Sequence, residues 1–229
     1  MRPVERGAAP QVFTNYRDAY PFLAQRMGDY CSYCERQIET HLAVEHVQPK
    51  NPVPALINSW TNFLLGCVNC NSCKGDTVVS LPDYLWPDTD NTLRAFEYEE
   101  GGSVKSNPDL DPAIRVKADA TIILTGLDKD PGNPALDRRP TEADRRWLKR
   151  KEAWDKATRC REILAIQDTA ETRELIVEVA KGKGMFSIYW AQFSHDSDMR
   201  RRLREAFVGT ANNCFDQAEN VQPRHGGQI

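Results

Sequence analysis

Two pairs of cysteines in the first third of the chain stand at metal-binding spacing. Cys31 and Cys34 form one C-x-x-C pair, and Cys67 and Cys70 form the other. Each pair places two thiolates on a tight turn, and two such turns facing each other make a closed tetrahedral site that suits zinc. A zinc ion with four thiolate ligands has no open position at which to activate water. The spacing therefore predicts a structural Zn²⁺, and any chemistry must come from the residues around it.

The residues between and just after these pairs suit phosphodiester hydrolysis. Glu45 and His46 are adjacent within the intervening segment, and Asn71 directly follows the second pair. The ordinary pKa of histidine suits deprotonation of a water near neutral pH. Carboxylate and amide oxygens can hold a divalent cation that neutralises charge on the scissile phosphate. We therefore expect His46 to act as general base, and Glu45 and Asn71 to hold a catalytic Mg²⁺ or Mn²⁺.

The adjacency of Glu45 and His46 sets a geometric condition. On a regular strand, neighbouring side chains point to opposite faces. Both can therefore serve one site only if the backbone bends there or the second cysteine pair folds across it. Pro49 favours an irregular turn shortly after His46.

A third cysteine, Cys73, follows the second pair at the same spacing. By symmetry with the first pair, Cys67 and Cys70 are the expected zinc ligands. Cys73 is expected to lie on the helix that follows, as a small packing residue.

The order of these motifs resembles that of a known nuclease family. Residues 27–76 carry the pattern C-x-x-C, acid-His-x-x-Pro and W-x-N-x-L-L-x-C-x-x-C-N-x-x-K, which is similar to the HNH endonucleases with a ββα-metal core and to their zinc-bound subset. The resemblance implies the roles given above for the acid, the histidine and the second asparagine, although the family usually has aspartate where Glu45 stands. It also implies that Asn62 ties the hairpin together without touching metal, and that Lys74 contacts phosphate.

A wider set of segments is similar to the PtuB family, the HNH component of Septu and some retron anti-phage systems. These segments are RPVERGAAP, GDYCSYCE, VEHVQPK, NFLLGCVNCNSCKG and WPDTDN. Because that family works beside an ATPase, PtuA, the resemblance implies an effector nuclease with a PtuA-like ATPase subunit as partner. DNA is the favoured substrate, and tRNA or other RNA is the alternative.

The chain is expected to belong to the α+β class, with a zinc-stapled ββα-metal (HNH) module followed by a mainly α-helical C-terminal region. A hairpin is predicted around Gly101, and a helix is predicted to start at Asp111. Thr141, with Asp144 three residues on, predicts the N-cap of a further helix. The expected divisions are an N-terminal lead-in (1–26), an HNH nuclease module with structural zinc (27–80), a hairpin-plus-helix connector (81–138), a helical partner-binding region (139–210) and a loose tail (211–229).

Composition and charge restrict the possible functions. The chain has 229 residues and a net charge of −3, which argues against a protein that coats nucleic acid by charge alone. The nuclease module is nearly neutral, so we expect a second subunit to supply affinity or gating. The basic stretches RRWLKRK and RRRLRE suit either phosphate contact or a solvated helix face. The cysteine pattern, the lack of an apolar run of about 18 residues and the lack of a secretory h-region favour a cytoplasmic protein.

A non-catalytic zinc module that binds nucleic acid or protein is the alternative. It accounts for the cysteine pairs and for the near-neutral charge. It gives no reason for the Glu45-His46 pair or for Asn71. Binding of a divalent cation at the acid–histidine site, in addition to zinc, separates the two functions.

Overall fold

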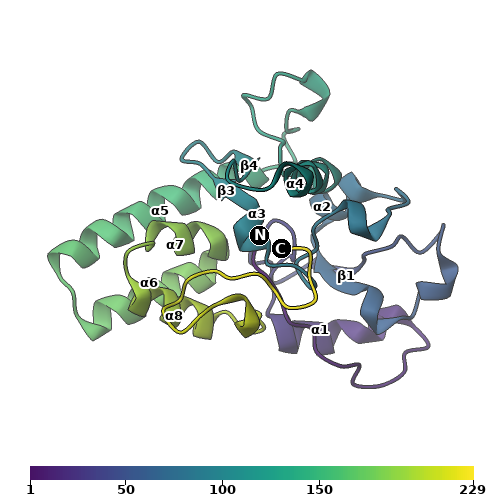
Figure 1. Ribbon diagram of the computed structural model, residues 1–229, viewed down its shortest axis with the longest axis horizontal. Coiled ribbons are helices and arrows are strands. Elements are labelled where there is room, and N and C mark those ends of the chain that lie inside the picture. Colours follow the sequence, from purple (N-terminus) through teal and green to yellow (C-terminus); the bar gives the residue numbers. More distant parts are fainter.

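The ββα unit expected around the cysteine pairs is present. In the computed structural model, which describes residues 1–229, β1 (Ala43–His46) runs antiparallel to β2 (Phe63–Gly66). Helix α2 (Val68–Lys74) follows β2, and the unit lies on the same side of the molecule as α1 (Tyr20–Met27) (Figure 1). With the helical C-terminal region described below, this confirms the α+β class.

Local chemistry fixes both ends of α2. The Cys67 thiol accepts a hydrogen bond from the Cys70 backbone N–H at 3.5 Å, so a cysteine of the second pair caps the helix. Gly75 follows its last residue with a φ of 52°, in the left-handed region that favours glycine. The second cysteine pair therefore lies at the N-terminus of α2, and Lys74 lies in its last turn.

The predicted hairpin and helix of the middle segment are also present. After the single turn of α3 (Thr92–Ala95), β3 (Phe96–Tyr98) pairs with β4 (Val104–Ser106). The Asp111 side chain accepts a hydrogen bond from the Ala113 N–H and caps α4 (Pro112–Thr125). Helix α4 lies against α2 (Figure 1), so the middle segment supports the ββα unit.

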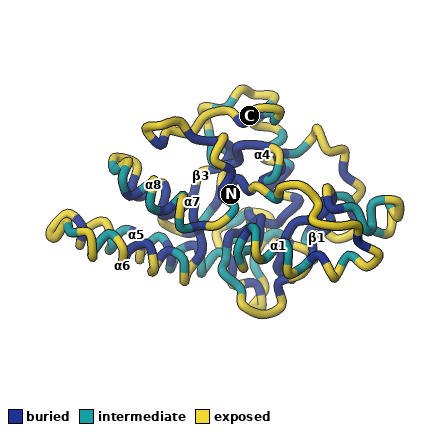
Figure 2. The backbone as a smooth tube through the Cα atoms, turned by 90° about the horizontal axis from the view of Figure 1, so that it is seen from below, coloured by how far each residue is buried: buried dark blue, intermediate teal, exposed yellow.

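The C-terminal region is helical, as predicted, and it contains four α-helices. They are α5 (Arg146–Ile166), α6 (Ala170–Lys183), α7 (Phe186–Gln192) and α8 (Ser197–Ala206). Helices α5 and α6 form a hairpin that projects from the body of the molecule (Figure 1), and much of its outer end is exposed (Figure 2). None of the helices combines the length and the apolar character that crossing a bilayer requires.

The predicted start of the first of these helices is wrong. Thr141 does not cap it, because α5 begins only at Arg146. Residues 141–144 form a turn, in which the Asp144 N–H donates to the Thr141 carbonyl at 3.0 Å. The Asp144 carboxylate accepts a hydrogen bond of 2.8 Å from Arg146 Nε. Asp144 is therefore bound to a buried guanidinium, and the helix starts after it.

One hydrophobic core spans the nuclease module and the helical region. It contains 48 buried residues and reaches from Met1 to Ile229. Phe63 of β2 and Phe186 of α7 both belong to it. The predicted boundaries between segments therefore do not separate independent cores, and the boundaries themselves stay a prediction.

The expectation of a loose tail after residue 210 is wrong. Asn91 Nδ2 donates to the carbonyl oxygens of Cys214 at 2.8 Å and Gln222 at 2.6 Å. Arg224 is buried and donates to the Val4 carbonyl at 3.1 Å. These bonds hold a polar segment against the core, and they depend on partners more than 100 positions away that a local polar composition does not reveal.

A buried carboxylate joins the first cysteine pair to the helical region. Glu35 directly follows this pair and is 3% exposed. Its carboxylate lies 3.0 Å from the Met1 ammonium and accepts hydrogen bonds from Tyr98 Oη at 3.1 Å and the Ser187 N–H at 2.8 Å. Burial alone would raise the pKa of Glu35, but the Met1 ammonium and the Ser187 hydrogen bonds hold it below its usual value.

We expect Glu35→Ala to lower the free energy of unfolding by about 3–5 kcal/mol, because it leaves a buried ammonium without its counter-charge. Urea unfolding followed by circular dichroism measures this change. The matched control is Glu39→Ala: Glu39 lies in the same segment and is exposed, so its loss should alter the free energy by less than about 0.5 kcal/mol. Equal stability of the two variants would contradict the role given to Glu35.

Candidate active site

The four predicted zinc ligands form one buried cluster. The sulfur atoms of Cys31, Cys34, Cys67 and Cys70 all lie within 4.8 Å of one another. A tetrahedral zinc with bonds of about 2.3 Å separates its sulfur ligands by about 3.8 Å, and the Cys34 and Cys67 sulfurs are 3.7 Å apart. The cluster therefore fits a structural Zn²⁺. Cys73 is not part of it and lies on α2, as expected.

Two guanidinium groups face the thiolates, and sequence analysis missed both. Arg36 Nη2 donates to Cys67 Sγ at 3.3 Å, and Arg146 Nη1 donates to Cys70 Sγ at 3.1 Å. Four thiolates around one Zn²⁺ carry a net negative charge, which these arginines offset. Arg146 belongs to α5 and lies 76 positions after Cys70, so the spacing of the cysteines carries no signal for it.

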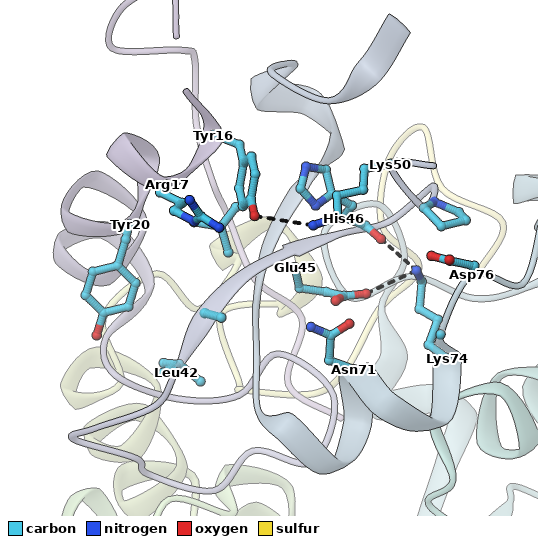
Figure 3. Close-up of a pocket in the computed structure, with 14 residues that line it drawn as sticks. Tyr16, Arg17, Tyr20, Leu42, Glu45, His46, Lys50, Asn71, Lys74 and Asp76 are labelled. Carbon is cyan, nitrogen blue, oxygen red and sulfur yellow. Dashed lines mark hydrogen bonds and ion pairs between the residues drawn. The ribbon is translucent and has the colours of Figure 1, made fainter. Parts of the chain in front are cut away.

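A pocket of about 400 Å³ lies between β1, α2 and the N-terminal lead-in. All four residues of β1 border it, together with Asn71 and Lys74 of α2 and Tyr16 of the lead-in (Figure 3). Because β1 pairs only with β2, its other edge is free of strand partners. The pocket therefore follows the length of the strand that carries the predicted acid and base.

Glu45 and His46 border this pocket from opposite faces of β1, as adjacent strand residues must. Glu45 faces α2, where its Oε1 lies 3.1 Å from Lys74 Nζ. The His46 ring packs on the other side, with ring centroids 4.8 Å from Tyr16 and 5.3 Å from Phe63. Glu45 and His46 nevertheless share one pocket, because α2, which carries the second cysteine pair, contacts β1 through Lys74. This is the second of the two conditions set by their adjacency, a bent backbone being the other.

One nitrogen of His46 is free to accept a proton. His46 Nε2 lies 2.9 Å from the Ile57 carbonyl oxygen, and since a carbonyl only accepts, the hydrogen bond places the ring hydrogen on Nε2. Nδ1 is then the basic nitrogen. Burial lowers the pKa of His46, the bond to Ile57 opposes this, and the charges of Lys50 and Lys74 lower it further. A neutral imidazole at pH 7 follows, as a general base requires.

Glu45 and Asn71 fit a divalent cation. Gly66 lets β2 approach Glu45 closely, since a Cβ at position 66 would lie 2.8 Å from the Glu45 Cβ. Glu45 Oε1 contacts Lys74 and the Tyr33 hydroxyl, whereas Oε2 has no hydrogen-bond donor. The Asn71 amide faces this carboxylate and is also without a partner (Figure 3). One carboxylate and one amide oxygen, completed by water and phosphate oxygens, would suit the oxygen coordination that Mg²⁺ or Mn²⁺ prefers.

The environment of Lys74 contradicts its expected phosphate contact. Its side chain is 2% exposed and pairs with Glu45. Its ammonium also donates to the His46 carbonyl oxygen at 2.7 Å. Lys74 therefore ties α2 to β1, and the burial that makes this tie possible keeps the ammonium away from a bound strand.

Asn62 lies outside the pocket and connects the two ends of the segment between β1 and β2. Its Oδ1 accepts a hydrogen bond from the Gln48 N–H at 2.7 Å, and its Nδ2 donates to the Gln48 carbonyl at 2.9 Å. The family resemblance implies that Asn62 links the two sides of the hairpin and does not bind metal, and these two hydrogen bonds agree with that role. Any effect of Asn62 on catalysis acts through the position of the hairpin.

Sequence analysis gave no role to Tyr16, Arg17 and Lys50, which also border the pocket. Tyr16 and Arg17 come from a short 3-10 helix, Tyr16–Ala19, and Lys50 comes from the turn after β1. Lys50 directly follows the acid-His-x-x-Pro segment, so its place near the site could have been found. The 3-10 helix lies more than ten residues before the first cysteine pair, and nothing in its pattern indicates that it folds back over His46.

Comparison with known proteins agrees with this site. Residues 31–77 match the family described as HNH endonuclease. The chain is also 30% identical over 82 residues to the Septu protein PtuB of Bacillus thuringiensis, and this match covers 33% of the chain and 32% of the relative. The likeness to PtuB thus concerns only a part of each protein. The match to the HNH endonuclease family concerns residues 31–77, the segment that holds the four clustered cysteines, Glu45, His46 and Asn71.

Proposed function

We propose that this protein is a metal-dependent endonuclease that hydrolyses phosphodiester bonds in nucleic acid. The observation that carries the proposal is the hydrogen bond of 2.9 Å between His46 Nε2 and the Ile57 carbonyl. It leaves Nδ1 basic in the pocket that Glu45 and Asn71 also border. The HNH match over residues 31–77 supports the same activity.

In the proposed reaction His46 Nδ1 takes the proton of the attacking water. The bond from Nε2 to Ile57 fixes the ring and stabilises the positive charge that forms on it. Glu45 and Asn71 hold the divalent ion, which when bound neutralises charge on the scissile phosphate and on the leaving oxygen. Lys74 keeps the acid and base in place through its contacts to both residues. The thiolate-bound zinc supports the scaffold and takes no part in the reaction.

The test is cleavage of plasmid DNA and of tRNA by the purified chain with Mg²⁺ or Mn²⁺, against EDTA. We expect cleavage to depend on the divalent ion by about a hundredfold or more in rate, because such an ion contributes several kcal/mol to the transition state. Zinc content is measured after EDTA treatment, and Mg²⁺ is added back, so that loss of zinc is not mistaken for loss of the catalytic ion. No cleavage with either ion, alone or with the ATPase partner, would contradict the proposal.

We also propose that the protein acts in the cytoplasm as the nuclease of a Septu-type anti-phage defence, with DNA as the favoured substrate and a PtuA-like ATPase as partner. The similarity to the Septu protein PtuB supports this role. Residues 139–210 are the proposed partner-binding region. Its projecting hairpin carries apolar side chains that face solvent, since Ile166 on α5 is 84% exposed and Leu175 on α6 is 66% exposed.

The two basic stretches of the helical region contribute little to substrate binding in this proposal. On α8, Arg202 pairs with Asp198 at 2.6 Å and Arg204 pairs with Glu219 at 2.7 Å. On α5, Arg150 is fully buried and donates to backbone carbonyls. Carboxylates or burial occupy these three arginines, so this proposal places the main phosphate contacts elsewhere.

A further inference from the structure

The catalytic pocket contains two cations that form no ion pair. Three cationic and two acidic side chains border it, which gives these side chains a net charge of +1. Lys74 is paired with Glu45. The Asp76 carboxylate accepts a hydrogen bond of 2.7 Å from a neighbouring neutral amide and keeps its charge. Arg17 and Lys50 are the two cations without an ion pair, and both lie outside the HNH pattern's acid, base and metal ligands.

The side chain of Tyr16 contacts both of these cations and also His46. Arg17 Cζ lies 5.4 Å and Lys50 Nζ 5.2 Å from the centroid of the Tyr16 ring, both within the range of a cation–π contact. Lys50 Nζ also donates to the Tyr16 hydroxyl at 3.4 Å. The same ring packs edge-on against His46, and Figure 3 shows Arg17, Tyr16, His46 and Lys50 along one side of the pocket, with Asn71 and Lys74 across from them.

We propose that Arg17 and Lys50 bind the backbone phosphates on either side of the scissile phosphate, and that Tyr16 positions them beside His46. The inference rests on the proposed nuclease function and assigns its substrate-binding residues. Guanidinium and ammonium groups are the usual ligands of phosphate oxygens. Contacts of this kind hold a strand in register without reading its sequence. Two such contacts make a weak site, which agrees with the need for a second subunit to supply affinity.

The test measures binding by the whole 229-residue chain with His46→Gln, which keeps a polar side chain of similar size beside Tyr16 and can hold a strand without cutting it. A short fluorescent oligothymidine is titrated with protein at several salt concentrations, and its anisotropy is recorded. When Arg17→Gln and Lys50→Gln are both introduced into this variant, its affinity for the oligothymidine should fall by about tenfold or more. The slope of log affinity against log salt should fall by about 1.4, because each phosphate contact to a single strand contributes about 0.7.

The matched control combines Arg161→Gln with Lys183→Gln. It removes the same charge from two exposed side chains of the helical hairpin that form no ion pair, and it should leave both the affinity and the slope nearly unchanged. If the pocket pair behaves like this control pair, or if the protein with both cations shows no salt-dependent binding, the inference is overturned.

Cleavage by the chain with His46 intact is measured in parallel, so that the inference and the proposed function can fail separately. If cleavage depends on the metal but the variant with Arg17→Gln and Lys50→Gln binds the oligonucleotide unchanged, the role of Arg17 and Lys50 is overturned and the nuclease function stands. Salt-dependent binding without metal-dependent cleavage, even with the ATPase partner, would overturn the nuclease function.

Discussion

Replacing His46 by alanine should reduce cleavage by about 10²–10⁴-fold or more, because a general base contributes that much to the rate. His46 Nδ1 is the basic nitrogen at the pocket, and Nε2 is committed to Ile57. The zinc cluster draws no ligand from His46, so zinc content should not change. Plasmid and tRNA cleavage with Mg²⁺, zinc analysis and a melting curve on the same preparations measure the three quantities.

Removing the ring also removes packing against Tyr16 and Phe63, so a second variant separates chemistry from stability. His46→Gln keeps a side chain that can donate to the Ile57 carbonyl but provides no base. It should melt close to the unchanged protein and be as inactive as His46→Ala. The control is His195→Ala, because His195 is exposed on the turn between α7 and α8 and should keep full activity. A variant at position 46 that still cuts at the original rate would refute the assignment of the base.

The sequence predicted those parts of the site whose residues share one short segment. The cysteine pairs, the acid–histidine pair and Asn71 all lie within residues 31–77, and their spacing reflects two turns, two short strands and one helix that fold locally. The environment of Lys74 could not be predicted in the same way. Whether a lysine in the last turn of α2 points outward or beneath the strand depends on packing, and here it lies between Glu45 and the His46 carbonyl.

Contacts between distant segments account for most of what the sequence left open. Arg146 reaches Cys70 from α5, and Asn91 holds the tail through Cys214. In each case an ordinary polar side chain finds its partner only in the folded chain, so neither periodicity nor composition marks it in advance. The same holds for Tyr16, whose contact with His46 depends on how the lead-in returns to β1.

Loss of the structural zinc should destabilise the whole protein and release α5 in particular. Without the ion the four cysteines no longer hold a shared negative charge, so Arg36 loses its counter-charge and Arg146 keeps only Asp144 as a charged partner. Arg146 is almost fully buried, and loss of a partner of a buried charge costs up to about 3–5 kcal/mol. For a chain of this size such a loss lowers the melting temperature by roughly 10 °C or more.

Cys70→Ser tests this expectation, with Cys73→Ser as its control. Both residues lie on α2, three positions apart, but only Cys70 belongs to the cluster. We expect Cys70→Ser to lose bound zinc by elemental analysis and to melt at a much lower temperature, whereas Cys73→Ser should keep both properties. If Cys70→Ser retains zinc and its melting temperature, the cluster is not the zinc site.

Hydrogen exchange locates the consequence within the fold. Because Arg146 stands at the start of α5 and bonds Cys70 Sγ, Thr125 O and Asp144 together, zinc loss should speed amide exchange in the first turns of α5 as well as around the cysteines. The N-terminal half of α6 takes no part in these bonds and should change least, whereas its last turn bonds to Tyr30 beside the first cysteine pair through the Lys181 carbonyl. If the amides of α5 exchange equally slowly with and without zinc, the helical region keeps its position independently of the metal. Arg146 would then neutralise the thiolates without coupling the zinc site to α5.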